Sequence, residues 1–240
     1  MATIAIYSLK GGVGKTTLAV NLAWTAAVQS SRRTLLWDLD PQAASTFLLT
    51  NNKPKGDALS IFAKDVAPDK LIRSTATPRL DVIPADASLR DLDRLFHELD
   101  KKKRLAKLLD GLNKDYDRIL LDCPPGLTET NKQAMRAADL IVVPVIPSPL
   151  SQRAFQALIG YLGTTKRVLP VHVMVDRRRR LHTDSVAANP GWPAIPMASV
   201  VEQMGVQRGP VGTFAARSPA ADAFAGLWRE VERWLAVPAR

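Results

Sequence analysis

The chain has 240 residues, of which 46% are hydrophobic, and its 33 lysines and arginines against 23 acidic residues give a formal net charge of +10. A chain of this length can bury a sizeable core, and its one cysteine, Cys123, excludes a framework of intrachain disulfides. Its longest apolar run, residues 140–146, is far shorter than the roughly 20 residues that span a bilayer, and we expect no signal peptide. The basic excess favours a polyanionic partner.

Short apolar runs alternate with helical patterns along the chain. The expected strands are residues 3–7, 34–38, 80–84, 118–122, 140–145 and 168–175. The expected helices include residues 16–29, 88–99, 104–112, 150–162 and 220–235. Near-continuous apolar strands separated by helices predict a single α/β domain over residues 1–240, with a mostly parallel twisted sheet and helices on both faces. Three prolines predict a loop over residues 189–198, with no unbroken strand or helix.

The first expected strand leads into the glycine-rich stretch Ser8-Leu9-Lys10-Gly11-Gly12-Val13-Gly14-Lys15-Thr16-Thr17. Backbone N–H groups in such a turn, together with the following helix N-terminus, bind phosphate oxygens. In the pattern G-x-x-x-x-G-K-[ST], Lys15 would reach the β and γ phosphates and the Thr16 hydroxyl would bind Mg²⁺. Here Leu9 replaces the first glycine, and Lys10 adds a second lysine. The stretch therefore predicts a phosphate-binding loop that carries two lysines.

Two later strands are expected to end in carboxylates. Asp38 and Asp40 follow the second strand on one side by strand alternation, and Asp122 ends the fourth. Because the carboxyl ends of parallel strands meet at one edge of a sheet, these side chains should lie beside the bound phosphates. Each aspartate, taken alone, also has a structural explanation. Asp38 could cap the end of the strand, and Asp40 could form a turn before Pro41. Cys123 is expected to be a buried packing residue.

These motifs resemble the ParA/MinD family of deviant Walker A P-loop ATPases, and most of all its small ParA partition or positioning proteins without an N-terminal helix-turn-helix. K-G-G-x-G-K-T-T resembles the family's phosphate loop, D-L-D-P-Q its switch I region and D-C-P-P the end of its Walker B strand. The resemblance covers almost the whole chain and is specific in residues 8–17, 35–42 and 118–126. It implies a P-loop NTPase domain that uses ATP and Mg²⁺ and hydrolyses ATP slowly until a dimer and an activator complete the site.

The resemblance also implies a role for individual residues. Lys10, Lys15 and Asp40 would be catalytic. Asp40 would orient the attacking water, and Lys10 would reach the nucleotide of a partner subunit in an ATP-sandwiched homodimer. Thr16, Asp38 and Asp122 would hold Mg²⁺, the aspartates through water. The implied nucleotide-binding residues are Lys10, Gly11, Gly12, Val13, Gly14, Lys15, Thr16 and Thr17 around the phosphates, and Met174, Asp176 and Pro210 near the adenine.

Non-specific double-stranded DNA is the expected partner, because arginines and lysines bind its phosphates without a recognition motif. The candidate contacts are Arg177, Arg179, Arg180, Arg208, Arg217, Arg229 and Arg233. Arg178 either belongs to this set or lies near the nucleotide. Residues 101–104 form a further basic run, which is at least as well explained as the solvent-exposed start of a helix. The resulting hypothesis is a cytoplasmic, nucleoid-associated ATPase that segregates or positions a plasmid, a chromosome region or a protein assembly with a ParB-like or other activator.

Two alternatives stay open. A MinD-like membrane-surface ATPase would use the apolar stripe of residues 220–235, but the opposite face of that helix carries two arginines and two glutamates. Such a mixed face lacks the basic excess that anionic lipids attract, so a core-facing helix is favoured and no membrane partner is expected. A small-molecule kinase or ligase with the same loop would turn over without DNA or a dimer.

Overall fold

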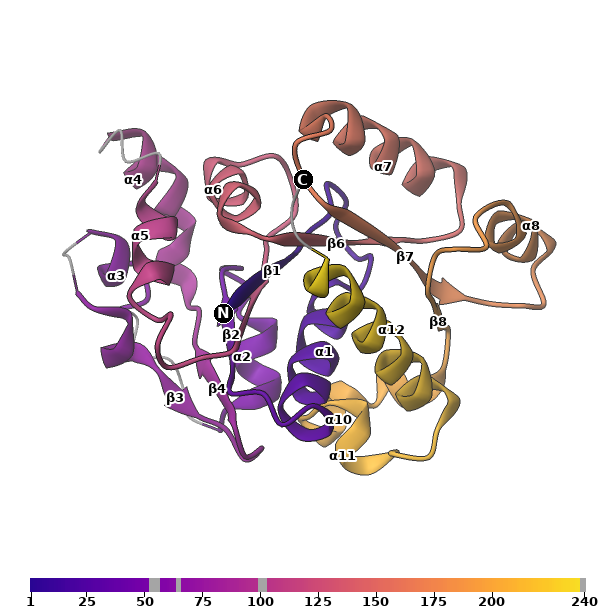
Figure 1. Ribbon diagram of the computed structural model, residues 1–240, viewed down its shortest axis with the longest axis horizontal. Coiled ribbons are helices and arrows are strands. Elements are labelled where there is room, and N and C mark those ends of the chain that lie inside the picture. Colours follow the sequence, from indigo (N-terminus) through magenta and orange to yellow (C-terminus); the bar gives the residue numbers. More distant parts are fainter. Residues whose placement is uncertain (52–56, 64–65, 99–102, 238–240) are drawn as a thin grey trace.

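One eight-stranded sheet organises the computed structural model, which describes residues 1–51, 57–63, 66–98 and 103–237. The strand order is β3-β4-β2-β5-β1-β6-β7-β8 (Figure 1). The strands are β1 Ala2–Ile6, β2 Thr34–Asp38, β3 Arg73–Ser74, β4 Leu80–Ile83, β5 Arg118–Asp122, β6 Leu140–Val145, β7 Val168–Val175 and β8 Ala194–Pro196. Paired strands are parallel except β3 and β4, which form an antiparallel edge. The predicted mostly parallel α/β sheet is confirmed.

Helices cover both faces of this sheet (Figure 1). The core under one face takes side chains from α1 Lys15–Gln29, α2 Ala44–Leu49, α10 Met204–Gln207, α11 Val211–Phe214 and α12 Pro219–Ala236, with α9 Ser199–Glu202 packed at its margin. The core under the other takes them from α3 Ser60–Ala63, α4 Leu92–Glu98, α5 Arg104–Asp110, α6 Glu129–Ala137 and α7 Pro149–Leu162. The short 3₁₀ turns η1 Pro68–Leu71 and η2 Ala87–Asp91 and the helix α8 Arg180–Ala188 complete the described elements.

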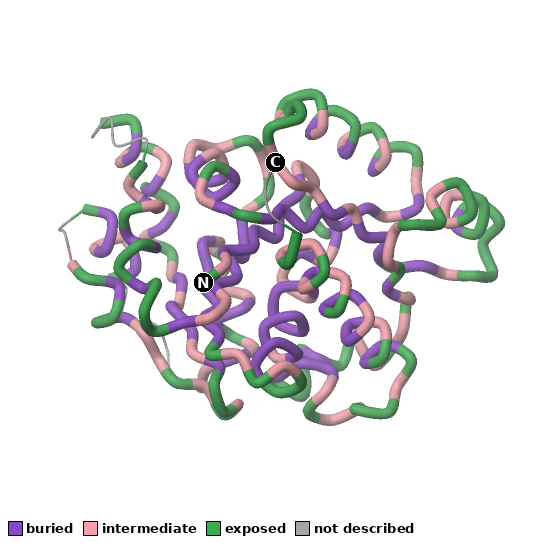
Figure 2. The backbone as a smooth tube through the Cα atoms, viewed as in Figure 1, coloured by how far each residue is buried: buried purple, intermediate pink, exposed green. Residues whose placement is uncertain are grey.

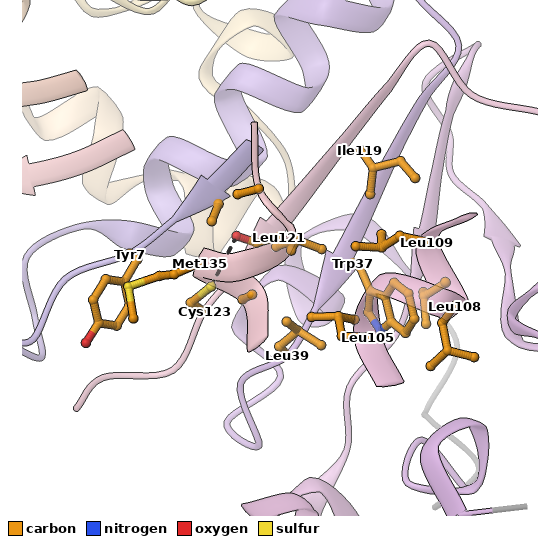
Figure 3. Close-up of a cluster of buried hydrophobic side chains, with 14 of the residues drawn as sticks. Tyr7, Trp37, Leu39, Leu105, Leu108, Leu109, Ile119, Leu121, Cys123 and Met135 are labelled. Carbon is orange, nitrogen blue, oxygen red and sulfur yellow. Dashed lines mark hydrogen bonds between the residues drawn. The ribbon is translucent and has the colours of Figure 1, made fainter. Parts of the chain in front are cut away.

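The central strands are mostly apolar because both of their faces are buried (Figure 2). In β1, Ile4 and Ile6 enter the core under α1 and α12, whereas Ala5 enters the opposite core. Figure 3 shows part of this second core, in which Trp37 of β2 and Leu121 of β5 face the leucines of α5. Cys123 is fully buried in the same core, as a packing residue should be.

Two segments differ from the sequence-based expectation. The loop expected over residues 189–198 contains β8, which pairs in parallel with β7. A three-residue strand at the sheet edge tolerates the flanking prolines, because an edge strand needs only part of its N–H groups for pairing. The helix expected over residues 88–99 is a 3₁₀ turn, η2, followed by α4, and Leu99 lies outside the described residues.

The apolar stripe of α12 faces the core, as predicted. Phe224, Leu227, Trp228 and Val231 are buried in the cluster that also contains the inner face of α1. Among the residues that the structure describes, no helix combines the length and apolar character that a bilayer crossing demands.

Candidate functional site

The glycine-rich loop joins β1 to α1. Gly12 and Gly14 have φ angles of +70° and +82°, a left-handed conformation that side chains with a Cβ rarely adopt. Gly14 directly precedes α1, and no side chain caps the helix there. The N–H groups of the first turn of α1 therefore remain available to an anion, and the helix dipole adds partial positive charge.

The two lysines of the loop occupy different environments. Lys15 is buried, and its Nζ donates a hydrogen bond to the Lys10 carbonyl at 3.2 Å. Burial lowers the pKa of the Lys15 ammonium, while the nearby charges of Asp122 and Asp40 act in the opposite direction. Lys10 is only partly buried, and its ammonium forms no ion pair with any residue in the described part of the chain. One lysine thus points into the site, and the other stands at its rim.

Asp38 and Asp122 lie directly opposite each other at the ends of β2 and β5. Asp38 is fully buried, and its Oδ2 accepts hydrogen bonds from the Thr46 N–H at 2.9 Å and the Thr46 hydroxyl at 2.8 Å. Asp122 is also buried, and its Oδ2 accepts a hydrogen bond from the Ser45 hydroxyl at 2.7 Å. Within the described residues, no donor reaches Oδ1 of Asp122.

This pair of carboxylates fits a bound cation. Burial raises the pKa of both carboxyl groups, and the charge of Asp122 raises that of Asp38 further. Hydrogen bonds from the hydroxyls of Ser45 and Thr16 oppose the effect of burial and lower the pKa of Asp122. A divalent cation near Oδ1 of Asp122 would let both carboxylates ionise together. Thr16 and Asp122, with Asp38 behind them, offer the few oxygen atoms that a Mg²⁺ site needs when phosphates and water complete the shell, and their use as ligands remains a prediction.

Asp40 lies beyond the end of β2 and is half-buried. Its N–H donates to Oδ1 of Asp38 at 3.1 Å, and its own Oδ1 accepts from the Gln42 N–H at 2.9 Å. A turn, and not the strand alternation expected from the sequence, therefore orients Asp40. Its charge still acts on Lys15, so the carboxylate lies within electrostatic reach of the phosphate loop.

An apolar pocket of about 110 Å³ adjoins the phosphate loop at Gly14 and Thr17. Its other lining residues come from α1, the ends of β7 and β8, and α9: Leu18, Val173, Met174, Ile195, Pro196, Met197, Ala198, Val201 and Glu202. Met174 has a φ angle of +54°, a strained backbone that tends to persist at functional sites. The pocket has the place and the apolar lining that a nucleotide base requires.

Met174 is the one residue of the three expected near the base that lines this pocket. Asp176 instead pairs with Arg178 and Arg179, and the Arg178 hydrogen bonds lower its pKa to about 2. Pro210 is buried at the start of α11, where the next residue donates its N–H to Asn21 of α1. Adenine contacts of Asp176 and Pro210 remain predictions.

The candidate DNA-binding arginines fall into two groups. Arg177, Arg179 and Arg180 are exposed between β7 and α8, where Arg180 pairs with Asp184. The second group lies along α10 to α12, where Arg217 and Arg229 are exposed and Arg233 pairs with Glu230. Arg208 differs from the others because its guanidinium binds backbone carbonyls of α2. Of the basic run at residues 101–104, residues 101 and 102 lie outside the described residues.

Two residues at the centre of the site, Ser45 and Thr46, were not predicted from the sequence. They bind Asp122 and Asp38 from the start of α2. A helix of fewer than two turns has no detectable periodicity, so its inner face could not be assigned. The only signal was a pair of adjacent hydroxyl residues shortly after Asp40.

Comparisons with known proteins identify the family of the chain. A family model described as an AAA domain matches residues 1–173. The sporulation initiation inhibitor protein Soj of Bacillus subtilis is 35% identical over 178 residues, which cover 72% of this chain and 68% of Soj. The chromosome partitioning protein ParA of Myxococcus xanthus is 37% identical over 145 residues, which cover 59% of this chain and 51% of that protein. The match thus spans about half to two thirds of these relatives.

Solved structures share the fold over nearly the whole chain. The complex of Cyanothece McdA(D38A) with ATP has a TM-score of 0.83 at 23% identity and covers 99% of this chain and 97% of its own. A cobyrinic acid a,c-diamide synthase from Mycobacterium smegmatis with an ATP analogue and magnesium reaches 0.81 at 23% identity, with coverages of 98% and 96%. At such identities the likeness establishes the fold alone, and the fold is shared by proteins of different activities. From the family model, the Soj match and the two-lysine phosphate loop together, the chain belongs to the ParA/MinD family of P-loop ATPases, close to the ParA partition proteins.

Proposed function

We propose that the protein is an ATP-hydrolysing dimeric switch that binds DNA without sequence preference in its ATP form and positions or segregates a cargo. The observation that carries this proposal is the contrast between the two lysines of the phosphate loop. Lys15 is buried and points into its own site, whereas Lys10 lies at the rim and forms no ion pair with the residues that the structure describes. A second protomer placed against this rim would receive Lys10 at its own triphosphate.

Hydrolysis would transfer the γ-phosphoryl group of ATP to water, a reaction that depends on positioning and charge stabilisation. The N–H groups of the loop and of the first turn of α1 would hold the phosphates, and Lys15 would lie on the β and γ phosphates. The half-buried Asp40 carboxylate, fixed by the turn at Gln42, would orient the attacking water. Mg²⁺, held by Thr16 and by Asp122 with Asp38, would neutralise phosphate charge.

The base would occupy the apolar pocket beside Gly14, with Met174 against it. In a face-to-face dimer each Lys10 would add a positive charge to the partner's transferred phosphoryl group, so each site would be complete only in the dimer. Such a requirement makes hydrolysis slow in the monomer and couples nucleotide turnover to assembly. An activator of the ParB type or another adaptor would accelerate it.

The net charge of +10 and the exposed arginines of α8 and α12 support DNA as the partner. The printed names of the relatives, which include chromosome partitioning proteins, support a role in positioning or segregation. A nucleoid location in the cytoplasm would follow from these two properties. The MinD-like alternative is disfavoured because the apolar stripe of α12 is used in the core.

The test combines three measurements on the whole chain: ATP hydrolysis with and without double-stranded DNA, molecular mass with and without ATP, and DNA affinity over a range of salt. We expect DNA binding that requires ATP and weakens steeply as salt rises. A mass that doubles with ATP is expected as well. Hydrolysis that needs neither DNA nor a dimer, together with transfer of phosphate to a small acceptor, would instead identify the kinase or ligase alternative.

A further inference from the structure

The short helix α2 is held at both ends by polar contacts, and those at its beginning reach the buried carboxylates Asp38 and Asp122. At its beginning, Ser45 and Thr46 donate to Asp122 and Asp38. At its end, the carbonyls of Phe47 and Thr50 accept hydrogen bonds from Arg208, a residue 158 or more positions away in sequence. α2 therefore connects the site to a distant part of the chain.

Thr46 is a junction of three elements. Its hydroxyl donates to Oδ2 of Asp38 at the end of β2 and accepts from the N–H of Ala85, just after β4, at 2.9 Å. Thr46 and Ser45 are both buried, so neither bond is shared with solvent. A shift of α2 would break these contacts and leave buried groups without partners, which is costly in a low-dielectric interior. The position of α2 thus sets the orientation of both carboxylates.

Arg208 holds the other end of α2 through hydrogen bonds and through contact with an aromatic ring. Its Nε and Nη2 donate to the Phe47 carbonyl at 3.2 and 2.8 Å, and Nη2 also donates to the Thr50 carbonyl at 2.7 Å. The guanidinium carbon lies 4.2 Å from the centroid of the Phe47 ring. The backbone of Arg208 has a φ angle of +49°, which is uncommon outside glycine and asparagine and directs the side chain to α2.

The segment that carries Arg208 is itself fixed to the helix of the phosphate loop. Asn21 of α1 is buried, and its Nδ2 donates to the Thr17 carbonyl and to Sδ of Met204. Its Oδ1 accepts from the Val211 N–H at 2.8 Å. Asn21 thus holds the chain on both sides of Arg208, at Met204 and Val211, and this gives the arginine a rigid base.

We propose that Arg208 is a positioning residue of the magnesium site, which holds α2 so that Ser45 and Thr46 keep Asp122 and Asp38 in place for Mg²⁺. The inference rests on the proposed use of ATP with Mg²⁺, and it assigns Arg208 a role other than the DNA contact expected from the sequence. Loss of a residue that hydrogen-bonds to a metal ligand changes metal affinity by about 10–100-fold. Arg208 does not contact the carboxylates itself but holds the helix whose residues do. We expect its loss to weaken Mg²⁺ binding by about 3–10-fold.

The experiment compares Arg208→Ala with Arg208→Lys and with Arg90→Ala, which removes an exposed arginine on η2 and matches the change in charge. The first readout is hydrogen exchange of residues 44–49 without nucleotide. The second is the affinity for a fluorescent ATP analogue with and without Mg²⁺, taken as the ratio of the two. The third is the slope of DNA affinity against salt at saturating Mg²⁺ and ATP.

For Arg208→Ala we expect faster exchange in α2 and a 3–10-fold smaller gain in ATP affinity from Mg²⁺, with unchanged affinity in its absence. Arg208→Lys should recover part of both effects, because an ammonium can donate to the same carbonyls but cannot lie flat on the Phe47 ring. Arg90→Ala should match the wild type. These results, with an unchanged salt slope, support the positioning role.

Unchanged exchange in α2 and an unchanged Mg²⁺ effect would overturn the inference, and a salt slope reduced by about 1 in the same variant would assign Arg208 to DNA instead. Failure of the proposed function is distinguishable, because a wild-type chain that binds no nucleotide still reports on the α2 contact through hydrogen exchange. Thermal unfolding of each variant separates local loosening from loss of the fold.

Discussion

Replacement of Thr46 by valine tests how strongly the two buried carboxylates, Asp38 and Asp122, depend on α2. Valine has the shape of threonine, so the change removes the hydroxyl without opening a cavity. The hydroxyl makes two buried hydrogen bonds, to Oδ2 of Asp38 at 2.8 Å and from the Ala85 N–H at 2.9 Å. Its loss leaves the Ala85 N–H without a partner and takes one donor from a buried carboxyl group.

Each of the two affected groups costs about 1–3 kcal/mol, and the extra methyl group returns about 1 kcal/mol, so we expect a loss of about 1–5 kcal/mol of unfolding free energy. The loss should depend on pH. Burial already raises the pKa of Asp38, so without metal its ionisation opposes folding as the pH rises from about 4 through that raised pKa. Valine removes a donor to the charged form and raises the pKa further, so the deficit should grow between acidic and mildly alkaline pH.

Urea unfolding without Mg²⁺, at about pH 5.5 and pH 8.5, measures both effects. Thr46→Ser is the control, because it keeps the hydroxyl and loses one buried methyl group, about 1 kcal/mol. A Thr46→Val protein within 0.5 kcal/mol of the wild type at both pH values, or a deficit that shrinks as the pH rises, would refute the reasoning about this carboxyl group.

Three further substitutions address the phosphate loop, the chemistry and the packing of α11. Lys15→Ala should weaken ATP binding by about 100-fold in a titration, because the triphosphate loses its buried cation; unchanged affinity would remove Lys15 from the site. Asp40→Ala should trap an ATP-bound dimer that hydrolyses at least about 100-fold more slowly, and normal turnover would exclude Asp40 from the mechanism. Gly212→Ala would place a Cβ 2.2 Å from the Trp24 ring and should lower stability in thermal unfolding by about 1–3 kcal/mol, whereas Gly226→Ala, whose nearest neighbour is 3.7 Å away, should not; equal stabilities would contradict this packing.

Much of the fold could be predicted from the sequence because its signals are local. Central parallel strands are buried on both faces, so β1, β2 and β5 stand out as near-continuous apolar runs. The phosphate loop is equally visible, because only glycine adopts the φ angles of Gly12 and Gly14 without strain. The carboxylates Asp38 and Asp122 follow from their place at strand ends.

The features that could not be predicted from the sequence depend on contacts between residues far apart in the chain. From the sequence alone, Arg208 cannot be distinguished from other surface arginines. Only the folded chain places it at the end of α2. Ser45 and Thr46 become parts of the site only because β2 and β5 pair with Asp38 opposite Asp122. β8 has three residues, of which the last is Pro196, and it directly follows Pro193, so its pairing with β7 is decided by the tertiary structure and not by local preference.

The central claim is that Lys10 acts on the nucleotide of the partner protomer, and mixing two inactive variants tests it most directly. Lys10→Ala lacks the amine but keeps Asp40, whereas Asp40→Ala lacks the carboxylate but keeps Lys10. If Lys10 acts across the dimer, a mixed dimer contains one complete site, and an equal mixture should recover roughly a quarter of the wild-type ATPase rate. If Lys10 acts within its own protomer, both sites of the mixed dimer are defective. A mixture that forms dimers with ATP and stays as inactive as its components would contradict the claim.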